Sequence, residues 1–122
     1  MKIYVGHPSS INYQKNLYEP LRSSSLTNEN KIILPHEESD ELFDSRSFLE
    51  KECDIIIAEV SEPSTGLGIE LGWADMYDVP IHCIHMEQSS YSSALTEVAD
   101  KIYAYRNSDE LVEIVEKIIE KK

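Results

Sequence analysis

A single carboxylate, Glu70, interrupts an apolar run that follows a glycine-rich turn in the middle of the chain. The turn contains Pro63, Gly66 and Gly68, and the segment that begins at Ile69 has the pattern of an apolar helix. On a helical projection Glu70 falls inside the apolar arc, where an unpartnered carboxylate is costly and therefore more often functional than decorative. Glu70 is a candidate nucleophile, and the alternative is a structural carboxylate that bonds a neighbouring loop or bridges a subunit interface.

The residues at the start of this helix could bind an anion beside Glu70. Ser64, Thr65 and Gly66 stand where first-turn N–H groups and the helix dipole favour negative charge. Gly66 and Gly68 carry no side chain, so a ligand can approach the backbone there. An anion site next to a half-buried carboxylate suits a sugar phosphate. A plain helix N-cap at Ser64 or Thr65 explains the same residues without a ligand.

Five short apolar runs, rich in β-branched residues, alternate with segments long enough for helices. The runs are 3–5, 32–34, 54–58, 81–84 and 102–105, and the expected helices are about 11–24, 45–52, 66–78, 91–99 and 108–121. A polar loop is expected from the segments 23–25 and 27–30. This alternation indicates a parallel sheet covered on both faces. The sequence predicts one α/β domain over 1–122: a three-layer, flavodoxin- or Rossmann-like doubly wound sheet of five parallel strands, in the order 2-1-3-4-5.

Ligands of such folds collect at the carboxyl ends of the strands, near the point where the strand order reverses. The segments that leave those ends are 6–10, 35–38, 59–66 and 86–93, and all are rich in Ser, Gly, Pro or His. We therefore expect the site to be built from these four segments.

The composition narrows the possible partners and the compartment. With 23 acidic and 11 basic residues the net charge is −12, which repels a nucleic-acid backbone. No apolar run reaches the length of a membrane span, and because the chain opens directly in a strand pattern we expect no signal peptide. Cys53 and Cys83 are expected to be buried free thiols, and His82 and His85 have no metal-ligand spacing. We expect a cytoplasmic protein without a metal or cofactor.

Residues 54–74 resemble the core motif of the nucleoside 2-deoxyribosyltransferase superfamily. The segment reads DIIIAEVSEPSTGLGIELGWA. It is closest to the branch of 2′-deoxynucleoside 5′-phosphate N-hydrolases, whose motif runs AEV-x-x-PS-x-G-x-G-x-ELG. The opening KIYVGHP is similar to the first strand of the superfamily, KIYLAGP. Length and element order also match, so the resemblance covers essentially the whole chain.

The resemblance implies roles for five residues. Glu70 matches the nucleophile that attacks the anomeric carbon of the deoxyribose, and Tyr4 matches a tyrosine near the sugar. Ser64 matches a serine that binds the 5′-phosphate, and Ser93 resembles a second phosphate serine contributed across a dimer interface. His36 matches a histidine near the base. Read without the resemblance, Tyr4 could equally be a core residue and His36 a surface residue at a strand end.

Two segments depart from the pattern of the family. Arg46 stands where the family usually carries an aspartate that supports the sugar and the leaving base, and the nearest candidate is Asp44. Asp44 could instead be a helix N-cap. The first loop of the hydrolases is Gly-Ser-Ile-Arg-Gly, whereas this chain has His7-Pro8-Ser9-Ser10 and no arginine. His7 and Ser10 are then the candidate phosphate donors of that loop.

The resemblance implies cleavage of the N-glycosidic bond of 2′-deoxynucleosides or their 5′-monophosphates. Glu70 would form a covalent glycosyl intermediate, and water or another nucleobase would accept the sugar. Two alternatives remain: a non-catalytic nucleotide-binding module on the same fold, and a dimeric interaction protein. A homodimer is also expected, because Ile69, Trp73 and Met76 extend the apolar surface of the helix expected at 66–78.

Overall fold

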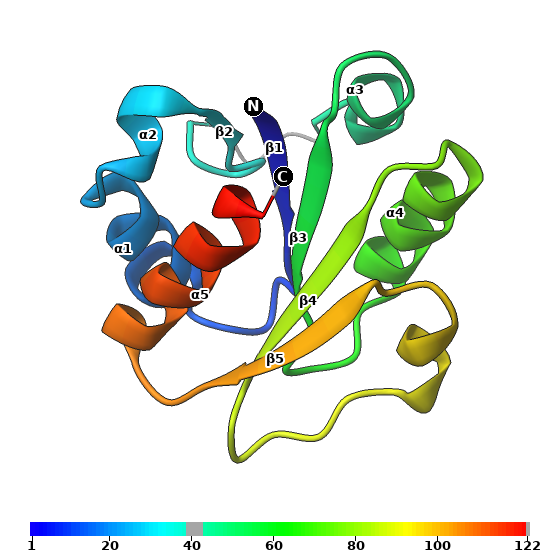
Figure 1. The fold of residues 1–122 in the computed structure, drawn as a ribbon. Helices are drawn as coiled ribbons and strands as arrows, with labels where there is room; N and C mark the ends of the chain where they lie inside the picture. The colour runs from blue at the N-terminus through cyan, green and yellow to red at the C-terminus, as the bar shows by residue number, and fades with distance from the viewer. Residues whose placement is uncertain (39–42, 122) are drawn as a thin grey trace.

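The computed structural model describes residues 1–38 and 43–121, and its centre is one parallel sheet. Five strands lie in the order β2-β1-β3-β4-β5 (Figure 1). Their bounds are β1 Lys2–Gly6, β2 Lys31–Ile33, β3 Ile55–Glu59, β4 Ile81–Met86 and β5 Lys101–Tyr105. The predicted fold class and strand order are therefore confirmed.

Helices cover both faces of the sheet, which makes three layers (Figure 1). One face carries η1 Gln14–Tyr18, α1 Glu19–Arg22, α2 Leu26–Glu29 and α5 Ser108–Glu120. The other carries α3 Ser45–Lys51 and α4 Thr65–Met76, and the short η2 Ser93–Glu97 follows β4. The end of β1 and the start of α4 thus belong to adjacent layers.

Three sequence expectations about the helices were wrong in detail. The single helix expected at 11–24 is a π-helical turn followed by a short α-helix, because Pro20 has no N–H to donate to Asn16. The segment 27–30, expected to be part of a loop, instead lies largely in α2. Within the segment 91–99 only Ser93–Glu97 is helical, and it is a 3₁₀-helix with Ser92 as its N-cap; the Thr96 hydroxyl donates to the Ser93 carbonyl at 2.7 Å.

Alternation along the strands decides which side chains meet α4. In β1, Ile3 and Val5 pack with α1 and α5, whereas Tyr4 packs with α3 and α4. The neighbouring β3 alternates in the same way and is buried along its whole length, as expected for a central strand. Tyr4 is therefore aimed at the helix that carries Glu70.

Cys83 is buried and Cys53 is half-buried, so the expectation of two fully buried thiols was correct for Cys83 only. Both are free, and burial raises the pKa of each thiol to about 11, so neither is a reactive thiolate near neutral pH. In the described part of the chain, no helix has both the length and the apolar character needed to cross a membrane. Residues 1–38 and 43–121 contain no group of three or more His, Cys, Asp or Glu side chains that could hold a metal ion.

Candidate active site

The side chains of Tyr4 and Glu70 meet between β1 and α4. The Tyr4 hydroxyl donates a hydrogen bond to Oε2 of Glu70 at 2.6 Å. Tyr4 is buried and Glu70 is half-buried. Burial raises the pKa of the Tyr4 hydroxyl, and the adjacent Glu70 carboxylate raises it further. Tyr4 therefore keeps its proton and acts as a donor that stabilises the carboxylate.

Gly6, the last residue of β1, allows α4 to come close to the end of the strand. A Cβ atom at this position would lie 2.6 Å from Cδ1 of the buried Leu67 and 3.5 Å from Oε1 of Glu70. The first separation is too short for carbon atoms, so any side chain here would push the helix away. The glycine thereby brings the Glu70 carboxylate up to the carboxyl end of the strand.

A pocket of about 520 Å³ opens above this pair of side chains. It lies at the carboxyl ends of β1 and β2 and at the start of α4, where the reversal of strand order predicts it. The structure brings six of the predicted site residues to it, namely Tyr4, His7, His36, Ser64, Gly66 and Glu70. Its other lining residues are Ser9, Pro35, Phe43, Ser45, Leu67, Ile69 and Trp73.

Four predicted site residues lie elsewhere in the structure. The Ser10 hydroxyl donates a hydrogen bond to Glu62 at 2.7 Å and does not line the pocket. Gly68 lines a neighbouring apolar pocket between α4 and the segment 90–98. Ser93 begins η2, on the segment after β4, and lines neither pocket. The segment 86–93 therefore contributes nothing to the pocket of Glu70, contrary to expectation.

Asp44, the fourth of these residues, is the N-cap of α3. Its carboxylate accepts a hydrogen bond from the backbone N–H of Ser47 at 3.1 Å, and it does not line the pocket. Arg46, at the position of the family aspartate, packs over the Trp73 ring at 5.6 Å and donates to the Tyr77 hydroxyl at 3.1 Å. Neither residue places a carboxylate beside Glu70.

A cluster of aromatic rings closes the other side of the pocket. The ring of His7 stacks on Tyr13 and meets the edges of Tyr18 and His36. Nδ1 of His7 lies 2.9 Å from the Pro8 carbonyl and Nε2 lies 2.6 Å from the Tyr18 hydroxyl. A carbonyl can only accept, so Nδ1 carries the proton and Nε2 accepts from Tyr18. The Tyr18 hydroxyl in turn accepts the backbone N–H of His36 at 3.0 Å.

The His7 imidazole is neutral in this setting. Burial lowers its pKa, the hydrogen bond to the Pro8 carbonyl raises it, and the neighbouring His36 lowers it again. The net pKa is below its ordinary value. Both ring nitrogens are already paired within the protein, so His7 supplies the pocket with a ring surface rather than a positive charge.

The loop that leads into α4 is anchored by a fully buried carboxylate, Glu59. Its oxygens accept the backbone N–H of Ser61 at 2.6 Å, the Ser61 hydroxyl at 2.8 Å and the Tyr105 hydroxyl. The Ser61 hydroxyl accepts the backbone N–H of Met86 at 2.8 Å. Strands β3, β4 and β5 are thus tied together just before Ser64, whose hydroxyl caps α4 by accepting the N–H of Leu67 at 3.2 Å.

Sequence reasoning assigned no role in the pocket to Ser45, Phe43 or Trp73. Ser45 is buried beside Tyr4, and a hydrogen bond between their side chains lowers the pKa of Tyr4, against the effect of burial. Phe43 stacks on Tyr4 with ring centroids 5.9 Å apart. Trp73, assigned from the sequence to a dimer surface, lines the pocket. Its helical spacing of three residues from Glu70 was the signal that could have placed it there.

Comparison with known proteins supports the resemblance seen in the sequence. No family model matches the chain. It is 37% identical over 70 residues to "Putative 2'-deoxynucleoside 5'-phosphate N-hydrolase 1" of Methanosarcina mazei, a match that covers 55% of this chain and 43% of that protein. It is 37% identical over 57 residues to the protein of the same name from Syntrophotalea carbinolica, covering 46% and 40%. The chain thus spans about two fifths of the length of these relatives.

A solved structure shares the fold over nearly its full length. The CMP N-glycosidase BcmB of Clostridium botulinum matches with a TM-score of 0.64 and 19% sequence identity, over 95% of this chain and 99% of that one. At this identity the likeness establishes the fold alone. The protein is therefore an α/β domain with the architecture of that glycosidase. A tyrosine–glutamate pair lies where its strand order reverses.

Proposed function

We propose that this protein cleaves the N-glycosidic bond of 2′-deoxynucleosides or their 5′-monophosphates. The observation that carries the proposal is the Tyr4–Glu70 hydrogen bond of 2.6 Å at a pocket large enough for a nucleoside. The names of the relatives, N-hydrolases of 2′-deoxynucleoside 5′-phosphates, and that of the structural neighbour, a CMP N-glycosidase, describe the same reaction class.

Glu70 acts as the nucleophile in this proposal. One of its oxygens forms a bond to the anomeric carbon while the bond from that carbon to the base nitrogen breaks, and the base leaves with the electron pair. Tyr4 holds Oε2, and Oε1 receives no hydrogen bond from the described residues, so Oε1 is the attacking atom. Water or a second nucleobase then displaces the sugar from Glu70 and regenerates the carboxylate.

The leaving base needs a proton, and the pocket offers few groups that could supply it. Tyr4 has a raised pKa and His7 is neutral with both nitrogens paired, so neither is a good acid. His36 lies on the same pocket and keeps its backbone fixed through Tyr18. We assign His36 to the end of the pocket that holds the base, where an imidazole can donate a proton or a hydrogen bond.

The decisive experiment is a base-release assay with wild type and Glu70→Gln. Wild type is expected to release free base from deoxynucleosides or their monophosphates, whereas Glu70→Gln binds the ligand without release, because an amide is a far poorer nucleophile. Binding without release by wild type would select a nucleotide-binding module. No binding at all would select the interaction protein.

We also propose that two copies form a homodimer. On the exposed face of α4, Ile69 is 49% and Met76 is 57% exposed, so this helix presents apolar side chains that a second copy could cover. Ser93 would then serve a site in the partner rather than in its own chain. Met76→Glu should convert a dimer to a monomer in light scattering with little change in melting temperature, and a wild-type monomer at micromolar concentration contradicts the assembly.

A further inference from the structure

We infer that the substrate of this pocket has an uncharged 5′ end, so that it is a 2′-deoxynucleoside with a free 5′-hydroxyl rather than a 5′-phosphate. The inference rests on the proposed function, because it chooses between two substrate classes for the same site. It departs from the names of the curated relatives, which specify the 5′-phosphate. The grounds are the charges that surround the pocket.

No lysine or arginine side chain lines the pocket within residues 1–38 and 43–121. Arg46 belongs to the helix beside the pocket, but its guanidinium is held on Trp73 and Tyr77. Among the described lining residues a phosphate dianion would therefore find no cation to pair with, whereas proteins usually hold phosphate with such groups.

Two polar side chains of the first loop are already paired within the protein, which leaves the Ser9 hydroxyl as the side-chain donor of this loop at the pocket. His7 donates its Nδ1 proton to the Pro8 carbonyl and accepts from Tyr18 at Nε2, so it has no N–H left to direct at a ligand. Ser10 donates its hydroxyl proton to Glu62 at 2.7 Å. The loop thus holds a carboxylate, rather than a cation, close to the start of α4.

The charge balance at the start of α4 opposes a dianion. The helix N-terminus contributes about half a positive elementary charge. Glu62, two residues before Ser64, and Glu70, on the second turn of α4, each contribute a full negative charge when ionised, as a nucleophilic Glu70 must be. A neutral 5′-hydroxyl meets no such repulsion. It can accept a hydrogen bond from the Ser64 hydroxyl, which lines the pocket.

The test compares the four common 2′-deoxynucleosides with their 5′-monophosphates at about pH 8, where an ordinary imidazole is neutral and the phosphate is a dianion. Base release gives kcat/KM, and calorimetric titration of wild type gives Kd for both ligands of each pair. We expect the nucleoside to be favoured at least about tenfold in both measurements at low salt, with the ratio falling as the salt concentration rises.

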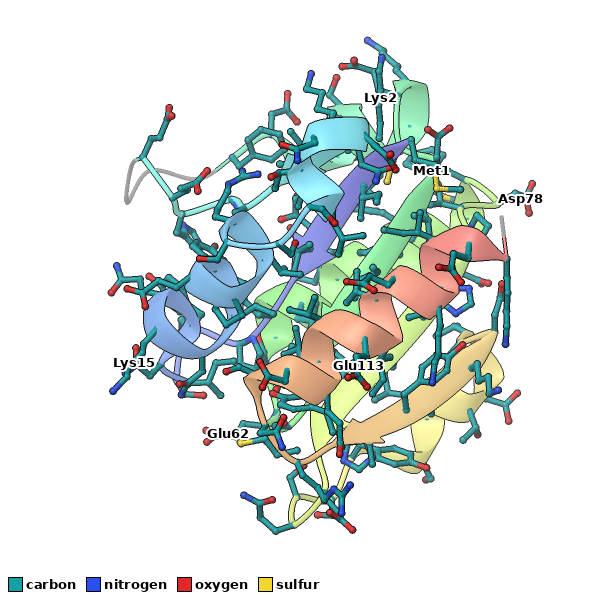
Figure 2. The ribbon with its side chains drawn as sticks, turned by 60° about the vertical axis from the view of Figure 1, so that its left-hand side comes forward. Met1, Lys2, Lys15, Glu62, Asp78 and Glu113 are labelled. Carbon is teal, nitrogen blue, oxygen red and sulfur yellow. The ribbon has the colours of Figure 1, made fainter. Side chains whose placement is uncertain are left out.

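Glu62→Gln tests the charge itself, because glutamine keeps an oxygen that can accept from Ser10. The variant should improve kcat/KM and Kd for the monophosphate about threefold or more and leave the nucleoside values nearly unchanged. Asp78→Asn is the matched control. It also removes one negative charge, and asparagine tolerates the positive φ of 58° at this position. Figure 2 shows Glu62 and Asp78 on opposite sides of the molecule. Asp78→Asn should therefore leave the preference for the nucleoside over the monophosphate as in wild type, in both kcat/KM and Kd.

The possible results separate this inference from the proposed function. Base release with equal or better use of the monophosphate overturns the inference and leaves the proposed function standing. A preference for the nucleoside that neither salt nor Glu62→Gln reduces also overturns it, because the discrimination is then not electrostatic. If no base is released but the nucleoside still binds more tightly with the expected response to salt and to Glu62→Gln, the inference holds and the proposed catalysis fails. Failure of both ligands to bind overturns both.

Discussion

The Tyr4 hydroxyl and the Glu70 carboxylate are 66 residues apart in the sequence and 2.6 Å apart in the structure. They come from different layers of the fold, and the absence of a side chain at Gly6 lets those layers meet. The hydrogen bond accounts for a carboxylate in the apolar arc of α4, because a charged acceptor with a buried donor costs less than an unpartnered one. The same bond orients the Glu70 carboxylate by holding its Oε2.

Tyr4→Phe tests this relationship. The substitution keeps the ring that packs on Phe43 and Phe48 but removes the donor to Glu70. A hydrogen bond to a charged group contributes about 1.5–3 kcal/mol, so kcat should fall about tenfold or more while KM changes little. Steady-state base release measures both constants. Tyr103→Phe on β5 is the control, and a wild-type kcat in Tyr4→Phe would show that Tyr4 is only a core residue.

Asp44 is predicted to act as a helix cap and not in the reaction. Asp44→Ala should lower the free energy of unfolding by about 1 kcal/mol, because the N–H of Ser47 loses its acceptor. Asp44→Asn should stay close to wild type, because asparagine caps nearly as well. Both variants should retain turnover. Thermal melts and base release decide the matter: a tenfold loss of turnover in Asp44→Asn at an unchanged melting temperature would give Asp44 the role of the missing family aspartate.

The fold could be predicted from the sequence because its central strands are short, apolar and rich in β-branched residues, and all alternate with helical segments. What could not be predicted depends on single residues with local effects. Pro20 lacks the N–H that an α-helical turn needs at its position, and the Thr96 hydroxyl bonds the Ser93 carbonyl within a 3₁₀-helix. Such effects are decided by hydrogen bonds that periodicity does not report.

The candidate site was predictable where one element determines the direction of a side chain. Strand alternation aims Tyr4 at α4, and the helical arc of α4 aims Glu70 back at the sheet. Ser10 and Trp73 were misplaced because their environment depends on how separate elements approach each other. Ser10 turns to Glu62 on another loop, and Trp73 lines the pocket with Arg46 of α3 packed over its ring.

The neutral state of His7 predicts a pH dependence of stability. Its pKa in the folded protein lies below the ordinary 6.5, so the unfolded chain binds the proton more tightly. This contribution to stability is fully present above about pH 6.5 and is lost as the pH falls toward the folded pKa. His7→Gln should be less stable at pH 7.5 but should lose less melting temperature between pH 7.5 and 5.5. If wild type and His7→Gln lost the same melting temperature between pH 7.5 and 5.5, the assignment of a neutral, buried His7 would be contradicted.

Ser64→Ala separates the two functions that Ser64 can have. Its hydroxyl oxygen accepts the N–H of Leu67 at 3.2 Å, so alanine should cost about 1 kcal/mol of stability as a lost cap. Its hydroxyl proton remains available for the 5′ oxygen of a ligand, and loss of that bond should raise Kd about fivefold for a deoxynucleoside. Asn107→Ala is the matched control, because Asn107 caps α5 through the N–H of Glu110 at 2.9 Å, on the opposite face of the sheet from the pocket.

The two variants should show similar losses in thermal melts and different losses in calorimetric titrations. Ser64→Ala combines a weaker cap with weaker binding, whereas Asn107→Ala should lose stability alone. Equal Kd values for both variants and wild type would show that Ser64 is only a cap, and the 5′ end of the substrate would then have to be held by the backbone N–H groups at the start of α4.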